Sequence, residues 1–386
     1  MITKNPRKKV MYVSGTRADF GLMIPILKAI EKSDGLELEI YATGIHLMSE
    51  FGKTVNYVKK EFPRVKVIKA DFKTDNRLST VKFISKFIGN LINKLTHNRP
   101  DIVLVLGDRP EMLSVATTCL YLGVPVAHIH GGDKSGTVDE TARHAITKLS
   151  HIHFAATKDS AERIRKMGEE KWRIHVVGAP ALDTILNEQL PTKKEIYRQL
   201  NLDKNKKFIL VTLHPISENV EKAGNQEKIV LAAVKKFRLP IVIIYPHADA
   251  GGRKIIKVIE EEKNNSLFHI FPSLNHKQFL ALERETVVWV GNSSGAMIES
   301  SSFRTPVVNI GTRQSGRQRG NNVIDVDYDR EQIETAIEKS LNDKKYLNSL
   351  AKIKNPWGDG KTTSRVAKIL ENIKIDSRLL TKQITY

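Results

Sequence analysis

The chain has 386 residues, of which 40% are apolar and 27% are charged, and it carries a formal net charge of +19 and one cysteine. This composition indicates a globular protein of about two domains, and it excludes a disordered chain, a fibrous protein and a disulfide-stapled module. No apolar run approaches the roughly 18 residues of a membrane span, and the first residues are too polar for a signal peptide, so we expect a cytoplasmic protein without a membrane partner.

The excess of positive charge would suit a nucleic-acid partner or an anionic small substrate. The lysines and arginines are spread along the whole chain, and no RNA- or DNA-binding motif with base-stacking aromatic residues occurs. We therefore expect no nucleic-acid partner. A basic RNA-associated protein stays open as the non-enzyme alternative.

Strands and helices alternate along the first half of the chain. Apolar runs predict strands at 9–14, 38–42, 65–68, 102–106, 124–129, 153–156 and 173–177. Apolar residues at helical spacing predict helices that include 22–30, 81–95, 112–122 and 139–149. This alternation is typical of an α/β fold with a doubly wound parallel sheet, and we assign residues 1–185 to such a Rossmann-like domain.

A second series of the same kind follows a charged connector at 187–202. Its predicted strands are 208–213, 241–245, 287–290 and 306–310, and its predicted helices are 226–237, 331–342 and 363–373. We expect a second Rossmann-like domain over 186–360, and a C-terminal helix and tail over 361–386 that pack back on the first domain. Two such domains facing each other would leave a cleft between them, the usual place for a ligand.

Polar side chains follow two neighbouring strands of the first predicted sheet. Asp108 comes directly after one strand, and His128, His130 and Asp133 lie at the end of the next. Because open α/β sheets bind ligands at the carboxyl ends of their strands, these residues predict one wall of an active site. The His-x-His spacing would also suit a metal ion, but this pattern alone is a weak signal, and we predict no metal.

Carboxylates near this wall are candidates for moving protons to and from carbon. They are Asp108, Asp139, Glu140 and Asp183. Asp139 also stands at the start of the helix predicted over 139–149, so capping that helix is an open alternative role.

The stretch from Gly291 to Glu299 joins a strand to a helix through small residues. Free amides at the helix start, with serine hydroxyls beside them, favour an anion cradle, and an ordinary N-cap is the open alternative. Glu299 is in place to bind a ribose diol. The absence of Gly-Lys-Ser/Thr argues against ATP hydrolysis.

Four arginines lie in turns that follow strands, where a guanidinium group can clamp a pyrophosphate. They are Arg17, Arg313, Arg317 and Arg319. Only Arg17 and Arg313 lie in Gly-Thr-Arg turns, which favours these two. His214 directly follows a buried strand, and it either donates to a phosphate or is a satisfied strand-end histidine.

The ordered set of motifs resembles the hydrolysing UDP-N-acetylglucosamine 2-epimerases of the sialic-acid and legionaminic-acid pathways. The matching segments span nearly the whole chain: Gly15-Thr-Arg-Ala-Asp19, Gly107-Asp-Arg109, His128-Ile-His-Gly-Gly132, Asp139-Glu-Thr-Ala-Arg-His-Ala-Ile-Thr-Lys148, Gly178-Ala-Pro-Ala-Leu-Asp183, Asn292-Ser-Ser-Gly295 and Gly311-Thr-Arg-Gln314. The resemblance implies a GT-B type fold and a UDP-sugar substrate. It also implies elimination of UDP to a 2-acetamidoglucal, rehydration to N-acetylmannosamine, no metal or redox cofactor, and a homodimer or homotetramer.

The same resemblance implies roles for individual residues. The catalytic set is Asp108, Asp139, His130, Arg109, Arg143 and Asp183. The UDP-binding set, mainly in the second domain, is Arg17, Asp19, His214, Asn292, Ser293, Ser294, Gly295, Glu299 and Arg313.

One position departs from the pattern, because some family members carry glutamate where this chain has His130. Either His130 or Asp133 is expected to take over a proton-transfer or hydrogen-bonding role. The change also fits a different sugar, the UDP-2,4-diacetamido-trideoxy substrate of legionaminic-acid synthesis. A GT-B glycosyltransferase and a non-hydrolysing epimerase stay open as enzyme alternatives, since a fold does not determine a function.

Overall fold

Central strands of the first sheet are short and buried along their length, as expected where helices cover both faces of a parallel sheet. The computed structural model describes residues 7–74 and 76–386, and in it seven parallel strands lie in the order β3-β2-β1-β4-β5-β6-β7. Their bounds are β1 (Lys8–Ser14), β2 (Leu36–Ala42), β3 (Lys66–Val67), β4 (Ile102–Leu106), β5 (Val126–Ile129), β6 (Ile152–Ala155) and β7 (Ile174–Val176).

The strand order reverses between β1 and β4, which pair with each other. Ligands of doubly wound sheets bind at such a reversal, outside the carboxyl ends of the strands. The connecting helices are α1 (Arg17–Lys32), α2 (Val55–Glu61), α3 (Arg77–His97), α4 (Pro110–Tyr121), α5 (Val138–Leu149) and α6 (Lys158–Lys166). Short 3-10 turns are η1 (Gly44–Leu47), η2 (Ser49–Phe51), η3 (Lys171–Arg173) and, in the second domain, η4 (Ser217–Lys222).

The second sheet has six parallel strands in the order β10-β9-β8-β11-β12-β13. They are β8 (Ile209–Thr212), β9 (Ile241–Ile244), β10 (Phe268–Phe271), β11 (Val288–Gly291), β12 (Val307–Ile310) and β13 (Val323–Val326). The helices around it are α9 (Ala223–Lys235), α10 (Gly252–Glu261), α11 (His276–Glu285), α12 (Ser294–Ile298), α13 (Ser300–Phe303), α14 (Arg330–Asn342) and α15 (Lys344–Leu350).

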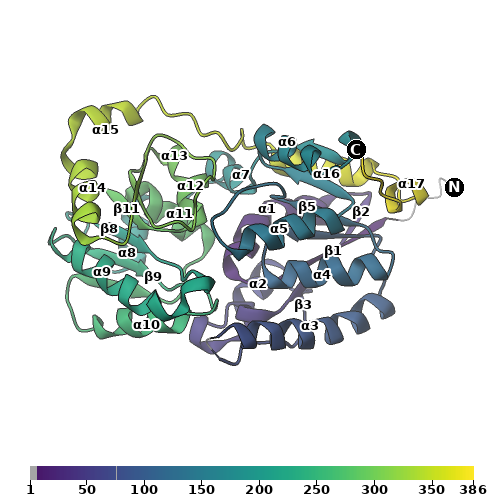
Figure 1. Cartoon of the computed structure of the whole chain (residues 1–386), viewed down its shortest axis with the longest axis horizontal. Coiled ribbons are helices and arrows are strands. Elements are labelled where there is room, and N and C mark those ends of the chain that lie inside the picture. Colours follow the sequence, from purple (N-terminus) through teal and green to yellow (C-terminus); the bar gives the residue numbers. More distant parts are fainter. Residues whose placement is uncertain (1–6, 75) are drawn as a thin grey trace.

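The two domains lie side by side (Figure 1), and the predicted fold class of two Rossmann-like domains of the GT-B type is confirmed. The predicted charged connector at 187–202 follows helix α7 (Pro180–Asn187) and is not irregular throughout, because it contains helix α8 (Lys193–Gln199). Helix α8 begins with a capping box between Thr192 and Glu195 and buries Ile196. The many charged residues of this segment therefore do not indicate an irregular connector.

The C-terminal segment returns to the first domain, as the yellow end of the chain shows in Figure 1. Helices α16 (Thr362–Asn372) and α17 (Ser377–Leu380) belong to this segment, and α16 packs on α1. Buried Arg173 donates to the carbonyl oxygens of Leu379 at 2.7 Å and Thr381 at 2.9 Å.

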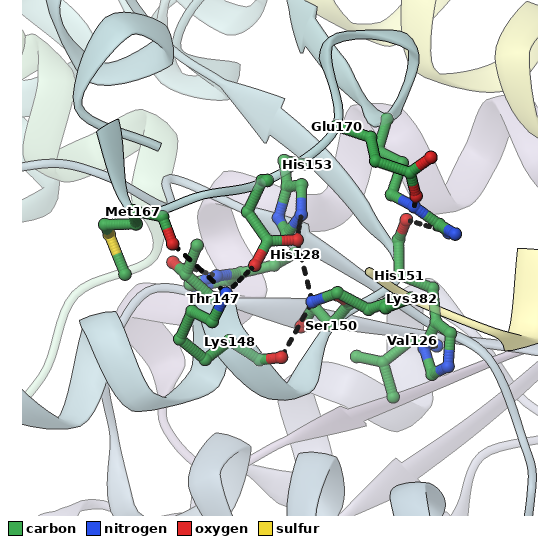
Figure 2. Close-up of polar contacts among 12 residues, drawn as sticks. Val126, His128, Thr147, Lys148, Ser150, His151, His153, Met167, Glu170 and Lys382 are labelled. Atoms are coloured by element: carbon green, nitrogen blue, oxygen red, sulfur yellow. Dashed lines mark hydrogen bonds and ion pairs between the residues drawn. The ribbon is translucent and has the colours of Figure 1, made fainter. Parts of the chain in front are cut away.

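Lys382 ties the tail to the end of α5. Its ammonium group donates to the carbonyl oxygens of Lys148 at 2.7 Å and Ser150 at 2.6 Å, and Figure 2 shows these three residues together. It also pairs at 2.7 Å with buried Glu169, which in turn contacts His153 at 2.9 Å.

In the described ranges 7–74 and 76–386, no helix combines the length and the apolar character that crossing a membrane demands.

Candidate active site

A cavity of about 480 Å³ lies between the two domains, and residues from both domains line it. Its walls contain the residues that follow β1, β4 and β5 of the first sheet and β9, β11 and β12 of the second. Carboxyl ends of parallel strands therefore face each other across the cavity, and its size suits a small organic ligand.

The cavity brings together most of the predicted catalytic residues and part of the predicted UDP-binding set. The predicted residues that line it are Asp19, Asp108, Arg109, His130, Asp139, Arg143, Ser294 and Arg313. Those outside its lining are Arg17, Asp183, His214, Asn292, Ser293, Gly295 and Glu299.

Asp108 follows β4, and its carboxylate pairs with the guanidinium group of Arg143 on α5. Arg143 is buried and also donates to the carbonyl oxygen of Asp133 at 3.0 Å. Arg109 contacts Glu111 at 3.2 Å and, across the domain boundary, Asp249 at 3.3 Å. Burial alone would lower the pKa of Arg109, but these carboxylates raise it above its ordinary value, so the group stays charged.

Asp139 lies in the first turn of α5 and lines the cavity. The alternative role of helix cap belongs instead to Thr137, whose side chain accepts from the Asp139 amide at 3.3 Å. The Asp139 carboxylate lies 3.7 Å from Arg313 of the second domain. Burial raises the pKa of Asp139, Arg313 acts against that shift and Asp249 adds to it, so both domains set the proton affinity of this acid.

The two histidines of the His-x-His segment have different surroundings. His128 lies within β5, and its ring nitrogens contact the Gly107 carbonyl oxygen at 2.7 Å and the Thr147 hydroxyl at 3.2 Å; Figure 2 shows it beside Thr147. Burial lowers the pKa of His128 to about 3, so it is a neutral core histidine. His130 instead lines the cavity and contacts Asp133. Among the described residues, no group of three or more His, Cys, Asp or Glu side chains is arranged to hold a metal ion.

Arg313 and Gln314 connect the cavity to the strand end at Asn292. Arg313 donates to the Asn292 carbonyl oxygen at 3.2 Å and Gln314 donates to it at 3.0 Å. The Asn292 side chain joins β11 to β8, since it accepts from the His214 amide at 2.7 Å and donates to the His214 carbonyl oxygen at 2.9 Å. Ser293 caps the short helix α12 through the Gly295 amide. These contacts hold the loops that follow β8, β11 and β12 together at the cavity.

Asp19 lines the cavity and His214 lies behind one of its lining residues, and both have partners within the chain. The His214 ring stacks on His247, which lines the cavity, at 4.6 Å between centroids. Asp19 accepts from the Ser14 hydroxyl at 2.5 Å and the Gly15 amide at 2.9 Å. Burial raises the pKa of Asp19 to about 7. The UDP-binding role of Asp19 stays a prediction.

Three of the predicted residues outside the cavity lining have surroundings that differ from those expected. Asp183 was expected around the sugar, but its two carboxylate oxygens accept from the amides of Thr362 at 2.9 Å and Thr363 at 2.6 Å, so it caps α16 and holds the C-terminal segment. The Glu299 carboxylate is buried 3.7 Å from His276. Arg17 has one buried guanidinium nitrogen without a hydrogen-bond partner among the described residues.

Several cavity residues are outside the predicted catalytic and UDP-binding sets. They include Arg317, one of the four arginines in turns that the sequence did not favour, and Gln314, His247 and Asp249. His247 and Asp249 follow β9, so the rule that placed Asp108 at a strand end would also have found them.

The model of the family described as UDP-N-acetylglucosamine 2-epimerase matches residues 28–371 of the chain. The chain belongs to this family. Among its epimerase relatives, a protein of Legionella pneumophila described as UDP-N,N'-diacetylbacillosamine 2-epimerase (hydrolyzing) is 39% identical over 380 residues, which are 98% of this chain and 100% of that protein.

Two further relatives come from Neisseria meningitidis. A UDP-N-acetylglucosamine 2-epimerase is 31% identical over 371 residues, which are 95% of each chain. A crystal structure of UDP-GlcNAc 2-epimerase bound to UDP-GlcNAc matches with a TM-score of 0.77 at 22% identity, and covers 94% of this chain and 99% of that one. At this identity the structural match shows a shared fold.

Proposed function

We propose that this member of the epimerase family hydrolyses a UDP-2-acetamido sugar and inverts its C2 centre, releasing UDP and a free 2-acetamido sugar. The observation that supports this best is the content of the cavity. Titratable side chains of the first domain, Asp108, Asp139 and His130, share it with Arg313 of the second. A site that must move protons at a carbon beside a departing diphosphate needs this combination of groups.

The proton at C2 is far too weakly acidic to be removed directly. When the bond between C1 and the diphosphate oxygen breaks, its electron pair leaves with UDP, and the developing oxocarbenium ion acidifies the proton at C2. A base removes that proton, and the C–H electron pair becomes the C1–C2 double bond of a glycal. Guanidinium groups such as Arg313 lower the barrier because they stabilise the charge on the departing diphosphate.

Water then adds across the double bond. Its oxygen atom bonds to C1, its surplus proton passes to a base, and an acid protonates C2 on the face opposite to the one that lost a proton. Inversion therefore requires proton carriers on both faces of the sugar. Asp139, whose pKa is raised by burial, suits an acid, and Asp108 and His130 complete the set.

For the sugar, we propose the UDP-2,4-diacetamido-2,4,6-trideoxy substrate over UDP-N-acetylglucosamine. Support comes from the 39% identity to the diacetylbacillosamine enzyme, against 31% to the N-acetylglucosamine enzyme, at nearly complete coverage of both. The apolar cavity residues Leu22, Phe72 and Val81 would also suit a methyl group at C6 and an additional acetyl group.

The test is NMR of the protein with each UDP sugar in deuterated water. We expect stoichiometric UDP and a free sugar of inverted C2 configuration that carries deuterium at C2, with the diacetamido sugar turned over faster. Recovery of an epimerised UDP sugar would indicate a non-hydrolysing epimerase. UDP sugar that stays intact without an acceptor would indicate a glycosyltransferase.

A further inference from the structure

Asp133 is fully buried beside the cavity and contacts groups from three parts of the chain. One carboxylate oxygen lies 2.9 Å from Nδ1 of His130 and 3.4 Å from a guanidinium nitrogen of Arg317. The other oxygen accepts from the Ser160 hydroxyl at 2.7 Å. Arg317 belongs to the second domain, 184 residues along the chain from Asp133. The carboxylate therefore joins a cavity histidine to the opposite domain.

These contacts determine which nitrogen of His130 carries a proton in the neutral ring. Burial would raise the pKa of Asp133, but His130, Arg317 and the Ser160 hydroxyl together hold it below its ordinary value, so the group is a carboxylate. A carboxylate only accepts hydrogen bonds, so the proton lies on Nδ1 of His130. Nε2, which has no hydrogen-bond partner among the described residues, is then left as a base at the cavity wall.

The backbone holds this arrangement in an unusual conformation. His130 has a φ of +62°, in the left-handed region that side chains other than glycine rarely adopt. Its amide donates to the Phe154 carbonyl oxygen at 3.1 Å, which ties the residue to the end of β6. Non-glycine residues in this region occur preferentially at functional sites, where surrounding contacts hold them.

The second domain reaches the same loop at two more points. The Gly136 amide donates to the Arg313 carbonyl oxygen at 2.9 Å. A Cβ atom at Gly136 would meet the Thr312 carbonyl oxygen at 1.9 Å, so only glycine allows this approach. The loop that carries Asp133 and leads to Asp139 thus packs directly on the loop that carries Arg317.

We propose that Asp133 is the positioning residue that makes His130 a proton acceptor, and that Arg317 of the second domain supports this pair from across the cavity. This inference rests on the proposed function and deepens it. The step it assigns is the removal of the C2 proton by Nε2 of His130, while the C1–oxygen bond breaks and its electron pair leaves on UDP. The imidazolium ion that results is stabilised by the Asp133 carboxylate, as in other carboxylate–histidine pairs.

Other charged and aromatic groups near His130 belong to both domains. The Trp357 ring lies 5.9 Å from the His130 ring, and the Arg317 guanidinium lies 5.9 Å from the same Trp357 ring. Glu299 and His128 also lie near enough to His130 to interact with it electrostatically. None of these groups has the direct 2.9 Å contact that Asp133 makes.

The first test is Asp133→Asn, which keeps the shape of the side chain and removes its charge. We expect kcat for the UDP sugar to fall on the order of 10² to 10⁴-fold, the usual contribution of a positioned acid or base, while UDP binds with unchanged affinity by titration calorimetry. Ser160→Ala, which leaves the carboxylate its other two contacts, should lower kcat much less. Unchanged kcat in Asp133→Asn would overturn the inference while wild-type turnover still supports the proposed function.

The second test distinguishes two roles for Arg317, which are stabilising the Asp133 carboxylate and binding phosphate directly. Without Arg317 the carboxylate should take up a proton at higher pH, so Arg317→Met should move the acid limb of the kcat/KM profile upward by about 1 pH unit. Arg317→Lys should restore part of the wild-type profile. Arg330→Gln, which removes an exposed charge that pairs with Glu334, is the control and should match wild type.

Two results would contradict the role of Arg317. An unchanged pH profile with weakened UDP binding would make it a phosphate clamp. A uniform loss of activity at every pH, with a lowered melting temperature, would make its role structural. If the wild-type protein itself released no UDP from either sugar, the proposed function would fail instead.

Discussion

Two buried histidine–carboxylate pairs lie in the first domain, and the ring nitrogen is 2.9 Å from the carboxylate oxygen in both. His130–Asp133 lies at the interdomain cavity, where Arg317 approaches from the second domain. His153–Glu169 lies under the C-terminal tail, where Glu169 also pairs with Lys148 at 2.6 Å and with Lys382 at 2.7 Å. The two pairs have the same chemistry and different surroundings.

The difference shows that two features determine the role of such a pair. One is the surroundings of the second ring nitrogen, and the other is the cationic side chain that contacts the carboxylate. Nδ1 of His153 is buried without a partner among the described residues, so it faces no substrate. Burial lowers the pKa of His153 to about 4, whereas the pKa of Glu169 falls to about 2 because its contacts with His153 and the lysines outweigh burial. A neutral ring and a charged carboxylate thus form an anchor for the tail, whereas His130 keeps a nitrogen for the cavity.

Replacing each histidine by glutamine tests this comparison most strongly. His130→Gln should lower kcat on the order of 10² to 10⁴-fold with little change in unfolding midpoint, because it removes a proton carrier. His153→Gln should lower the unfolding midpoint in urea and leave kcat/KM within a few-fold of wild type. Steady-state kinetics and urea unfolding of both variants provide the measurement, and equal kinetic effects would remove the distinction.

Substitution of the cavity carboxylates should lower turnover, as substitution of His130 should, and should not act mainly on stability, as substitution of Glu169 should. Asp139→Asn and Asp108→Asn should each lower turnover on the order of 10²-fold or more while UDP affinity stays close to wild type, since proton transfer is lost and the phosphate contacts are kept. Coupled measurement of UDP release and calorimetric UDP titration would check both. Undiminished turnover in either variant would remove that residue from the catalytic set.

Breaking the anchor should cost stability and not activity. Glu169→Gln leaves Lys382 with its positive charge largely buried, and removing one partner of such a pair costs about 3 kcal/mol of unfolding free energy. Lys382→Met should be milder, because Glu169 keeps Lys148 and His153. Glu162→Gln, which breaks an exposed pair with Arg165, is the control and should change the unfolding free energy little.

Much of the fold could be predicted because its central strands are continuous apolar runs such as β4, and the α/β alternation then determines a parallel sheet. The edge strands β10 and β13 are only partly buried and mix polar with apolar residues, so no run marks them. The sequence of helix α10 does have apolar residues at helical spacing, Ile255, Val258 and Ile259, which are buried in the structure, and the prediction overlooked them.

The candidate site could be predicted only within each domain. Asp108, His130 and Asp139 lie at strand ends or helix starts of one sheet, so local rules bring them together. The contact between Asp133 and Arg317 depends on how two domains sit against each other, which no local pattern encodes. The same holds for Asp183, whose helix-capping partners lie 179 and 180 residues further along the chain.

The smallest expected effect is in the dependence of stability on pH, and it comes from the anchor. The pKa of His153 is about 4 in the folded protein against an ordinary 6.5, so the unfolded chain binds more protons and stability falls as pH drops from 6.5 towards 4. Glu169, with a folded pKa of about 2 against 4.5, continues the loss as pH falls from 4.5 to 2.

His153→Gln should therefore weaken the fall in urea-unfolding free energy between pH 6.5 and 4, while Glu169→Gln should weaken it below pH 4.5. Other buried neutral histidines such as His128 keep part of the slope in both variants. If neither slope changed relative to wild type, the anchor would not be the proton-linked element, and the contrast with the cavity pair would rest on kinetics alone.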